Sequence, residues 1–243
     1  MPTTQSLSRI PQLTVSCSWH IYYAAGPSVL SDQRSHVLVG GASPWDPYTY
    51  LGQIRDDWSI DGTVVKVNDK NYYVYSCFVG GPQSNCIAEL LTPSTTGPSV
   101  LLSSPTEEWE LSETPVNEGP HALYHEDKVF LTFSGSFCWT PDYALGLLTY
   151  DGSGDPLAAS SWTKTGPHFS SANGEYGTGH NSFLTSPDGS EIWNVYHSTP
   201  QAGGNCGSDR YSNAQRVEWN EDGTPEFGQP LGYGVVQVGP SGE

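Results

Sequence analysis

A unit that occurs three times in this chain constrains its fold more than any other feature. Each copy opens on a polar residue, continues as a short apolar run, turns at an Asp and then becomes an aromatic-rich strand. The opening residues are Asp61, Glu118 and His180, and the turn Asp follows after 8, 9 and 8 residues. The copies are spaced by 57 and 62 residues. Repeats of this length made of short strands are typical of β-propeller blades.

A weaker copy precedes these three. It takes Gln12 as its opening residue, 49 residues before Asp61, and residues 18–26 resemble the later aromatic strands. The chain is therefore predicted to be all-β, with about four blades. Because it begins at a pattern that fits a second strand, we expect a five-bladed β-propeller type, incomplete, with the first blade largely absent. No linker or low-complexity tract interrupts it, so residues 1–243 are predicted to form a single domain truncated at its N-terminus.

Composition excludes several classes of partner. The chain has 26 acidic and 9 basic residues, which gives a formal net charge of −17. A surface of this sign repels phosphate backbones and anionic lipid. No apolar run approaches the length of a membrane span. We therefore expect neither a nucleic-acid partner nor a membrane partner.

The five cysteines have no metal-ligand spacing. Cys77 and Cys86 flank a short loop that a disulfide could close. The start of the chain has no hydrophobic signal core. The small number of Lys residues and the acidic balance favour an extracellular origin.

In a propeller the first strand of every blade lines the central axis, so the three opening residues are predicted to converge there. Two carboxylates held close together cannot both ionise cheaply, and the one with the raised pKa becomes a proton donor. Hydrolysis of a glycosidic bond needs such a donor, because the departing oxygen is protonated as the bond breaks. We predict Glu118 as the general acid and Asp61 as the carboxylate that tunes it.

Each opening residue also has a structural explanation when taken alone. Asp61-Gly and Glu118-Gly-Pro are common in turns and loops, and His180 fits a hydrogen-bonded core histidine. Their shared register favours a common functional point, because turn chemistry does not require it. Ser134-Gly-Ser lacks the glycine pattern of a serine-hydrolase elbow, and the histidines do not form a zinc motif.

Several segments together resemble glycoside hydrolase family 43, the five-bladed propellers that include α-L-arabinofuranosidases, arabinanases and β-xylosidases. The likeness extends from about residue 10 to residue 230 and is greatest for the exo-acting arabinofuranosidases. The matching segments are residues 19–26, 58–63, 117–120, 176–183, 195–197 and 219–228.

The resemblance implies roles for individual residues. Glu118 would be the general acid, and Asp61 would tune its pKa and orient the substrate. His180 would lie on the axis, where family members often hold a water-coordinated calcium ion; no other cofactor is implied. The family's general base, an Asp of the first blade, would lie upstream of Met1. Further substrate contacts are predicted from Trp58, Ser136, Tyr176, His180 and Arg210.

The activity implied is that of a secreted, monomeric glycosidase that cleaves arabinan or arabinoxylan with inversion, as an exo-acting α-L-arabinofuranosidase. General-base assistance is commonly worth roughly 10²–10⁴-fold in rate, so a chain without the base is expected to turn over poorly. Two alternatives stay open: a catalytically inactive carbohydrate-binding propeller, and a β-xylosidase of the same fold.

Overall fold

The computed structural model describes residues 6–10, 18–26 and 29–243. Strands account for 53% of the chain and helix for 4%, which confirms the all-β prediction. Gln12, predicted to open the first copy, lies outside the described residues, as does Cys17. The helices within the described ranges are single 3-10 turns, and none is long and apolar enough to cross a membrane.

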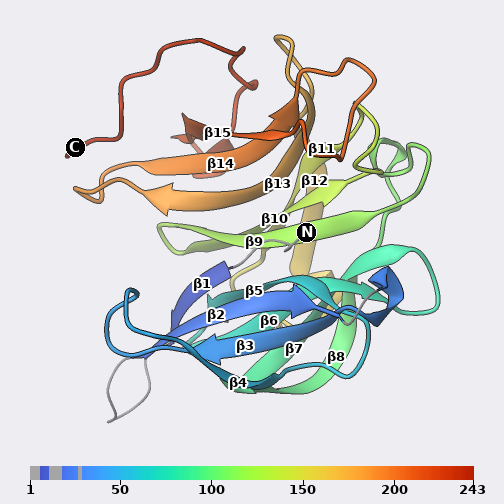
Figure 1. The fold of residues 1–243 in the computed structure, drawn as a ribbon, viewed down its shortest axis with the longest axis vertical. Helices are drawn as coiled ribbons and strands as arrows, with labels where there is room; N and C mark the ends of the chain where they lie inside the picture. Colours follow the sequence, from blue (N-terminus) through green and yellow to red (C-terminus); the bar gives the residue numbers. More distant parts are fainter. Residues whose placement is uncertain (1–5, 11–17, 27–28) are drawn as a thin grey trace. The chain divides into compact units, whose positions relative to one another are not determined.

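The chain divides into two compact units, the first ending at Ser103 and the second spanning Ser104–Glu243. The first unit holds two four-stranded antiparallel sheets, each in sequence order (Figure 1). The first sheet consists of β1 (Ser6–Ile10), β2 (Ser18–Ala25), β3 (Arg34–Val39) and β4 (Thr49–Gln53), with the 3-10 turn η1 (Leu30–Asp32) between β2 and β3. The second sheet consists of β5 (Ile60–Val67), β6 (Lys70–Phe78), β7 (Gln83–Thr92) and β8 (Thr95–Ser103).

The second unit continues the pattern with a four-stranded, a three-stranded and a two-stranded antiparallel sheet. The four strands are β9 (Asn117–His125), β10 (Lys128–Gly135), β11 (Ala144–Tyr150) and β12 (Trp162–Phe169). The three strands are β13 (Tyr176–Thr185), β14 (Ile192–Thr199) and β15 (Tyr211–Arg216), and the pair is β16 (Glu218–Trp219) with β17 (Pro225–Glu226). Two 3-10 turns, η2 (Glu108–Glu110) and η3 (Ala159–Ser161), lie outside the sheets.

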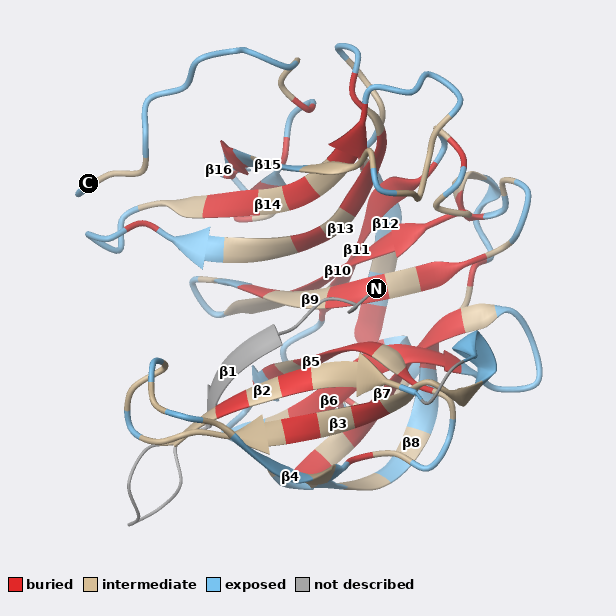
Figure 2. Cartoon of the chain, in the orientation of Figure 1, coloured by how far each residue is buried: buried red, intermediate tan, exposed pale blue. Residues whose placement is uncertain are grey.

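The three repeated units correspond to three of these sheets. Asp61 and Glu118 are the second residues of β5 and β9, and His180 lies in the middle of β13. These three are the first strands of their sheets. The aromatic segments form the second strands, β6, β10 and β14, which are largely buried (Figure 2). The repeat is thus confirmed as a series of antiparallel meanders. The five-bladed arrangement stays a prediction.

A β-bulge interrupts the first strand of all three copies at the same place. In each copy, three steps along the first strand are matched by two steps along the second, so the first strand carries one extra residue. The flanking pairs are Ile60–Ser76 and Thr63–Val74, Glu118–Ser134 and His121–Thr132, and Gly179–His197 and Ser182–Val195.

The position of the bulge shows that the second copy must be aligned one residue later than its sequence suggested. The first bulged residue has a positive φ in every copy: 55° at Asp61, 57° at Gly119 and 49° at His180. Gly119 is therefore the equivalent of Asp61 and His180, and Glu118 lies one position earlier. Counted from Gly119, the turn residue Asp127 follows after 8 residues, as in the other two copies.

Large apolar and aromatic side chains fill the interior of each unit. In the first, Tyr22, Tyr73 and Tyr75 pack in one buried cluster. In the second, Phe130 and Phe169 belong to an equivalent cluster. Burying a side chain of this size contributes about 1.5–3 kcal/mol. The aromatic-rich second strands are therefore explained largely by packing.

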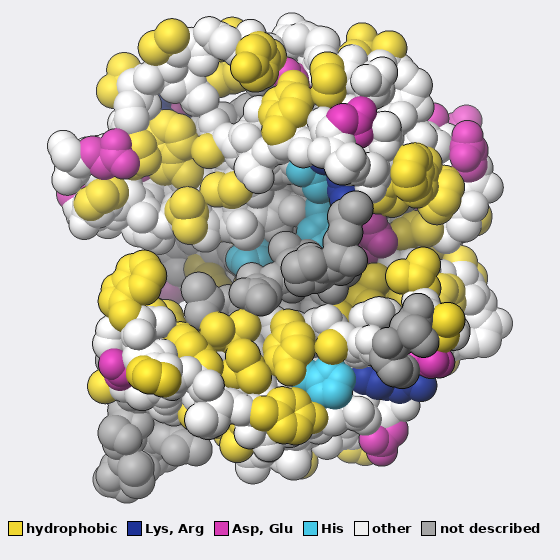
Figure 3. Space-filling view, viewed as in Figure 1, with side chains coloured by type: hydrophobic (Ala, Val, Ile, Leu, Met, Phe, Trp, Pro, Cys, Tyr) yellow, Lys and Arg dark blue, Asp and Glu magenta, His cyan; other side chains and the backbone are white. Residues whose placement is uncertain are grey.

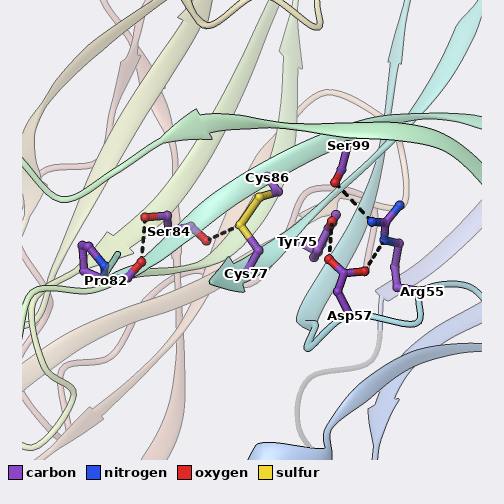
Figure 4. Close-up of a disulfide and its surroundings, with 8 residues drawn as sticks. All are labelled: Arg55, Asp57, Tyr75, Cys77, Pro82, Ser84, Cys86 and Ser99. Carbon is purple, nitrogen blue, oxygen red and sulfur yellow. Dashed lines mark hydrogen bonds and ion pairs between the residues drawn. A yellow bond between two sulfur atoms is a disulfide. The ribbon is translucent and has the colours of Figure 1, made fainter. Parts of the chain in front are cut away.

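The disulfide considered for Cys77 and Cys86 is present and joins β6 to β7. Figure 4 shows a polar cluster near it, in which the Arg55 guanidinium contacts Asp57 at 2.8 Å and Ser99 at 3.1 Å. A second disulfide, between Cys138 and Cys206, spans 68 residues and was not predicted.

Candidate active site

A buried polar network fixes the chain just before Glu118. The side chain of Asn117 donates a hydrogen bond to Glu110 Oε1 at 3.0 Å. Glu110 is fully buried and pairs with Lys164 at 2.9 Å. Its other oxygen accepts from the backbone N–H groups of Thr106 and Glu107 at 2.6 and 2.8 Å. A carboxylate so fully paired is held rigidly, and β9 therefore begins from a fixed point.

Glu118 is the second residue of β9 and is half-buried. The Tyr143 hydroxyl donates a hydrogen bond to Glu118 Oε1 at 2.8 Å. The same hydroxyl lies 3.4 Å from His180 Nδ1. Tyr143 is fully buried, so it is a fixed partner for both. Two of the residues predicted to converge, Glu118 and His180, are thus brought together around one tyrosine.

His180 is held on the first bulged position of β13. Its backbone N–H donates to Ser134 Oγ at 2.7 Å, and Ser134 is the cross-strand partner of Glu118. A Cβ added to Gly119 would lie 3.1 Å from the His180 ring. The glycine therefore lets the imidazole approach the β9 backbone directly, beside the carboxylate.

His197, on β14, forms the next layer. Its ring stacks on Tyr143 with centroids 5.6 Å apart and planes at 11°. Its Nε2 lies 3.3 Å from Nη1 of Arg210. Because arginine can only donate, Nε2 is the acceptor and the proton lies on Nδ1. Burial, followed by the nearby His180 and Arg210, lowers the pKa of His197 to about 3.

His121 completes a group of histidines in this unit. Burial lowers its pKa to about 4, with His180 contributing. His121 and His197 are therefore neutral imidazoles at pH 5 and above. Figure 3 shows histidine side chains gathered beside a basic side chain on the face it presents.

Asp61 and Trp58 belong to the first unit. Asp61 is buried, and Ser76 Oγ lies 3.4 Å from its Oδ2. Trp58 donates from its indole to Leu30 O at 2.8 Å and packs on Phe78 with ring centroids 4.6 Å apart. A meeting of Asp61 with Glu118 at one point stays a prediction.

The other predicted substrate contacts lie in the second unit. The Ser136 hydroxyl donates to Trp109 O at 2.9 Å and accepts from Ser112 N at 3.0 Å. Tyr176 is half-buried and pairs with Thr199 at the start of β13. Arg210 contacts His197, as described above. Substrate binding by these residues, and by Trp58 and His180, stays a prediction.

The surroundings of His180 do not by themselves make a calcium site. Calcium takes six to eight oxygen ligands, whereas His180 presents an imidazole next to one hydroxyl and one carboxylate. Within the described ranges, no group of three or more His, Cys, Asp or Glu side chains is arranged to hold a metal ion. A water-coordinated ion at His180 stays a prediction.

The sequence model of glycosyl hydrolases family 43 matches residues 15–225. The chain belongs to this family. It is 38% identical over 239 residues to a Streptomyces avermitilis protein named extracellular exo-alpha-(1->5)-L-arabinofuranosidase, a match covering 90% of this chain and 49% of that protein. It is 35% identical over 237 residues to alpha-L-arabinofuranosidase 43 of Humicola insolens, again covering 90% and 49%. The chain thus spans about half the length of the curated relatives it matches.

Solved structures of the family share the fold. A crystal structure of alpha-L-arabinofuranosidase from Lactobacillus brevis superposes with a TM-score of 0.84 at 31% identity, covering 96% of this chain and 77% of that one. A thermostable family-43 glycoside hydrolase superposes with a TM-score of 0.76 at 27% identity, covering 93% and 75%. The family resemblance stated from the sequence is therefore confirmed.

Two residues around Glu118 and His180, Tyr143 and His197, were not predicted as site residues. Tyr143 lies in a loop of no recognisable motif, five residues after Cys138. His197 lies within residues 195–197, one of the family-like segments, but no role was predicted for it. The Cys138–Cys206 disulfide also had no local signal, because its cysteines are far apart in sequence.

Proposed function

We propose that this chain is the catalytic part of a glycoside hydrolase that acts on arabinose-containing plant polysaccharides such as arabinan and arabinoxylan, as an exo-acting α-L-arabinofuranosidase. The observation that carries the proposal is the half-buried carboxyl group of Glu118, held by the Tyr143 hydroxyl beside His180. Family membership and the names of the relatives support the choice of sugar.

In this proposal Glu118 protonates the oxygen of the departing sugar as the glycosidic bond breaks. Inversion requires that water attack the opposite face of the arabinose with help from a base carboxylate roughly 6.5–9.5 Å from the acid. None of the residues named here is assigned to that base, so turnover by this chain is expected to be slow. Asp61 tunes the acid and holds a sugar hydroxyl. Arg210 and His180 supply polar contacts to the substrate, because a neutral sugar is bound chiefly by hydrogen bonds.

The proposal also includes a five-bladed propeller, secretion and action as a monomer. The antiparallel meanders support the propeller. The word "extracellular" in the names of two relatives supports secretion, as do the two disulfides, since such bonds persist in oxidising compartments.

The test is release of free sugar from methyl α-L-arabinofuranoside and from methyl β-D-xyloside, whose leaving groups need protonation, with Glu118→Gln beside Glu126→Gln. Glu126 is an exposed carboxylate at the turn of the same hairpin, so it is a matched control. The proposal is supported if the chain hydrolyses the arabinofuranoside and this activity is lost in Glu118→Gln but kept in Glu126→Gln. Preference for the xyloside would identify a β-xylosidase. Calorimetric binding of arabino-oligosaccharides without any release would indicate a carbohydrate-binding protein.

A further inference from the structure

Two loops of the second unit end at residues of the site. The β10–β11 loop, residues 136–143, ends at Tyr143, and the β14–β15 loop, residues 200–210, ends at Arg210. The Cys138–Cys206 disulfide joins these loops, with the two Cα atoms 5.4 Å apart. The polypeptide alone links them only distantly, because the two cysteines are 68 positions apart in sequence.

The loops are also fitted to one another sterically. Gly204 has a φ of 76°, and a Cβ added there would lie 2.2 Å from the carbonyl carbon of Thr140. Only glycine combines this backbone conformation with such a close approach. Beyond the disulfide, Arg210 Nε donates to Gly207 O at 3.3 Å. The crosslinked segment therefore helps to position the guanidinium group of Arg210.

From Arg210 a continuous series of contacts leads to the carboxyl group. Arg210 Nη1 lies 3.3 Å from His197 Nε2. The His197 ring stacks on Tyr143, and the Tyr143 hydroxyl donates to Glu118 Oε1 at 2.8 Å. We call Arg210, His197 and Tyr143 the Tyr143 column. At one end the column is attached to Gly207, the residue after Cys206 of the disulfide, and at the other end it contacts Glu118.

We propose that Tyr143 is a positioning residue for Glu118, and that the Cys138–Cys206 disulfide keeps the Tyr143 column in register. The hydrogen bond from the Tyr143 hydroxyl to Oε1 orients the carboxyl group, so the transferable proton of the acid is carried on the other oxygen, Oε2. When that proton passes to the departing sugar oxygen, which receives the electron pair of the broken C–O bond, Glu118 becomes an anion. The hydrogen bond from Tyr143 is then charge-assisted and stronger, which favours the transition state over the ground state.

The inference rests on the proposed function only for the role of Glu118, and its test does not require turnover. Protein labelled with ¹³C at the glutamate side-chain carboxyl is studied by NMR at one fixed pH, with Glu118→Gln assigning the Glu118 signal. Tyr143→Phe is expected to shift that signal by well over its line width, and Cys138→Ala/Cys206→Ala to shift it in the same direction. Tyr150→Phe and Cys77→Ala/Cys86→Ala are the matched controls. They remove another buried tyrosine hydroxyl, bonded to Gly154 O, and the other disulfide.

The decisive measurement combines the two changes. If the disulfide acts through Tyr143, removing it in the Tyr143→Phe background leaves the Glu118 signal where Tyr143→Phe alone put it. Additive shifts, an unmoved signal in either variant, or equal shifts in the controls would overturn the proposal. Should Tyr143→Phe fail to fold, the ¹³C signal of Tyr143 Cζ is measured instead, in protein that keeps Tyr143. That signal must move on Glu118→Gln and stay in place on Glu126→Gln.

Discussion

The hairpins that carry Asp61 and Glu118 share one backbone feature but hold their carboxylates differently. In the first unit, the residue with positive φ at the bulge is the acid itself, Asp61, which is buried and lies beside Ser76. In the second unit, the bulged residue is Gly119. The acid Glu118 precedes it, is half-buried, and is held by a tyrosine from another segment.

The comparison shows that one repeated bulge offers two adjacent positions for an acid. An Asp on the bulge itself tolerates the left-handed conformation better than most residues, but it is enclosed. A glycine on the bulge takes up that conformation without a side chain, so the neighbouring carboxylate is left partly accessible. Of the two, Glu118 has the better position for a group that must reach a substrate.

Glu118→Gln is expected to have the largest effect. An amide cannot donate a proton to the departing oxygen, so kcat should fall by roughly 10²–10⁴-fold. The loss in Glu118→Gln should be largest on unactivated arabinosides, because a nitrophenyl leaving group needs little protonation. Asp61→Asn should lower the rate less on the unactivated substrates, because the acid itself remains. Steady-state kinetics on nitrophenyl and unactivated arabinosides measure both. Equal losses on all substrates for both variants would contradict the division of roles.

The next largest effect is expected from removing the disulfides, and it should differ between the two units. In the chain-entropy view, a loop of 68 residues contributes about 4 kcal/mol to the free energy of unfolding and a loop of 9 about 2.5 kcal/mol. Cys138→Ala/Cys206→Ala should therefore lower stability more than Cys77→Ala/Cys86→Ala. Guanidinium unfolding of both variants measures the difference. A greater loss in the second variant would indicate that strain in the folded state, and not loop length, sets the contribution.

Acid should destabilise the second unit through its neutral histidines. The folded pKa of His197 is about 3 and that of His121 about 4, below the ordinary 6.5. The unfolded chain therefore binds more protons below pH 6.5, so stability is lost as the pH falls. For His197 alone, the loss from pH 7 to pH 5 is at most about 2 kcal/mol. Denaturation curves at these pH values, with His197→Gln flattening the dependence, test the prediction. An unchanged slope in that variant would exclude His197 as its source.

Much of this architecture follows from the sequence. The spacing of Asp61, Glu118 and His180 predicts three first strands, because the apolar run, the turn Asp and the aromatic strand are local signals. The one-residue offset at Glu118 could not be predicted from the sequence, because a bulge alters strand pairing and not composition. The 9-residue interval from Glu118 to Asp127 was its one trace in the sequence. The contact of Tyr143 with Glu118 joins residues 25 apart through a loop. It therefore depends on tertiary packing, which no local pattern encodes.

Exchanging the bulge residues should give a smaller effect, with opposite signs in the two hairpins. Gly119→Ala places a Cβ at a φ of 57° and 3.1 Å from the His180 ring, which should cost about 1–2 kcal/mol of stability. Asp61→Gly relieves a non-glycine residue of a φ of 55° and should gain up to about 1 kcal/mol, while removing the carboxylate. Thermal unfolding and arabinofuranoside assays measure the two consequences separately. If the bulges are equivalent, stability must fall in Gly119→Ala and hold or rise in Asp61→Gly. A loss of stability in both variants would mean that Asp61 stabilises its hairpin through its side chain. The similar backbone of the two copies would then not imply similar energetics.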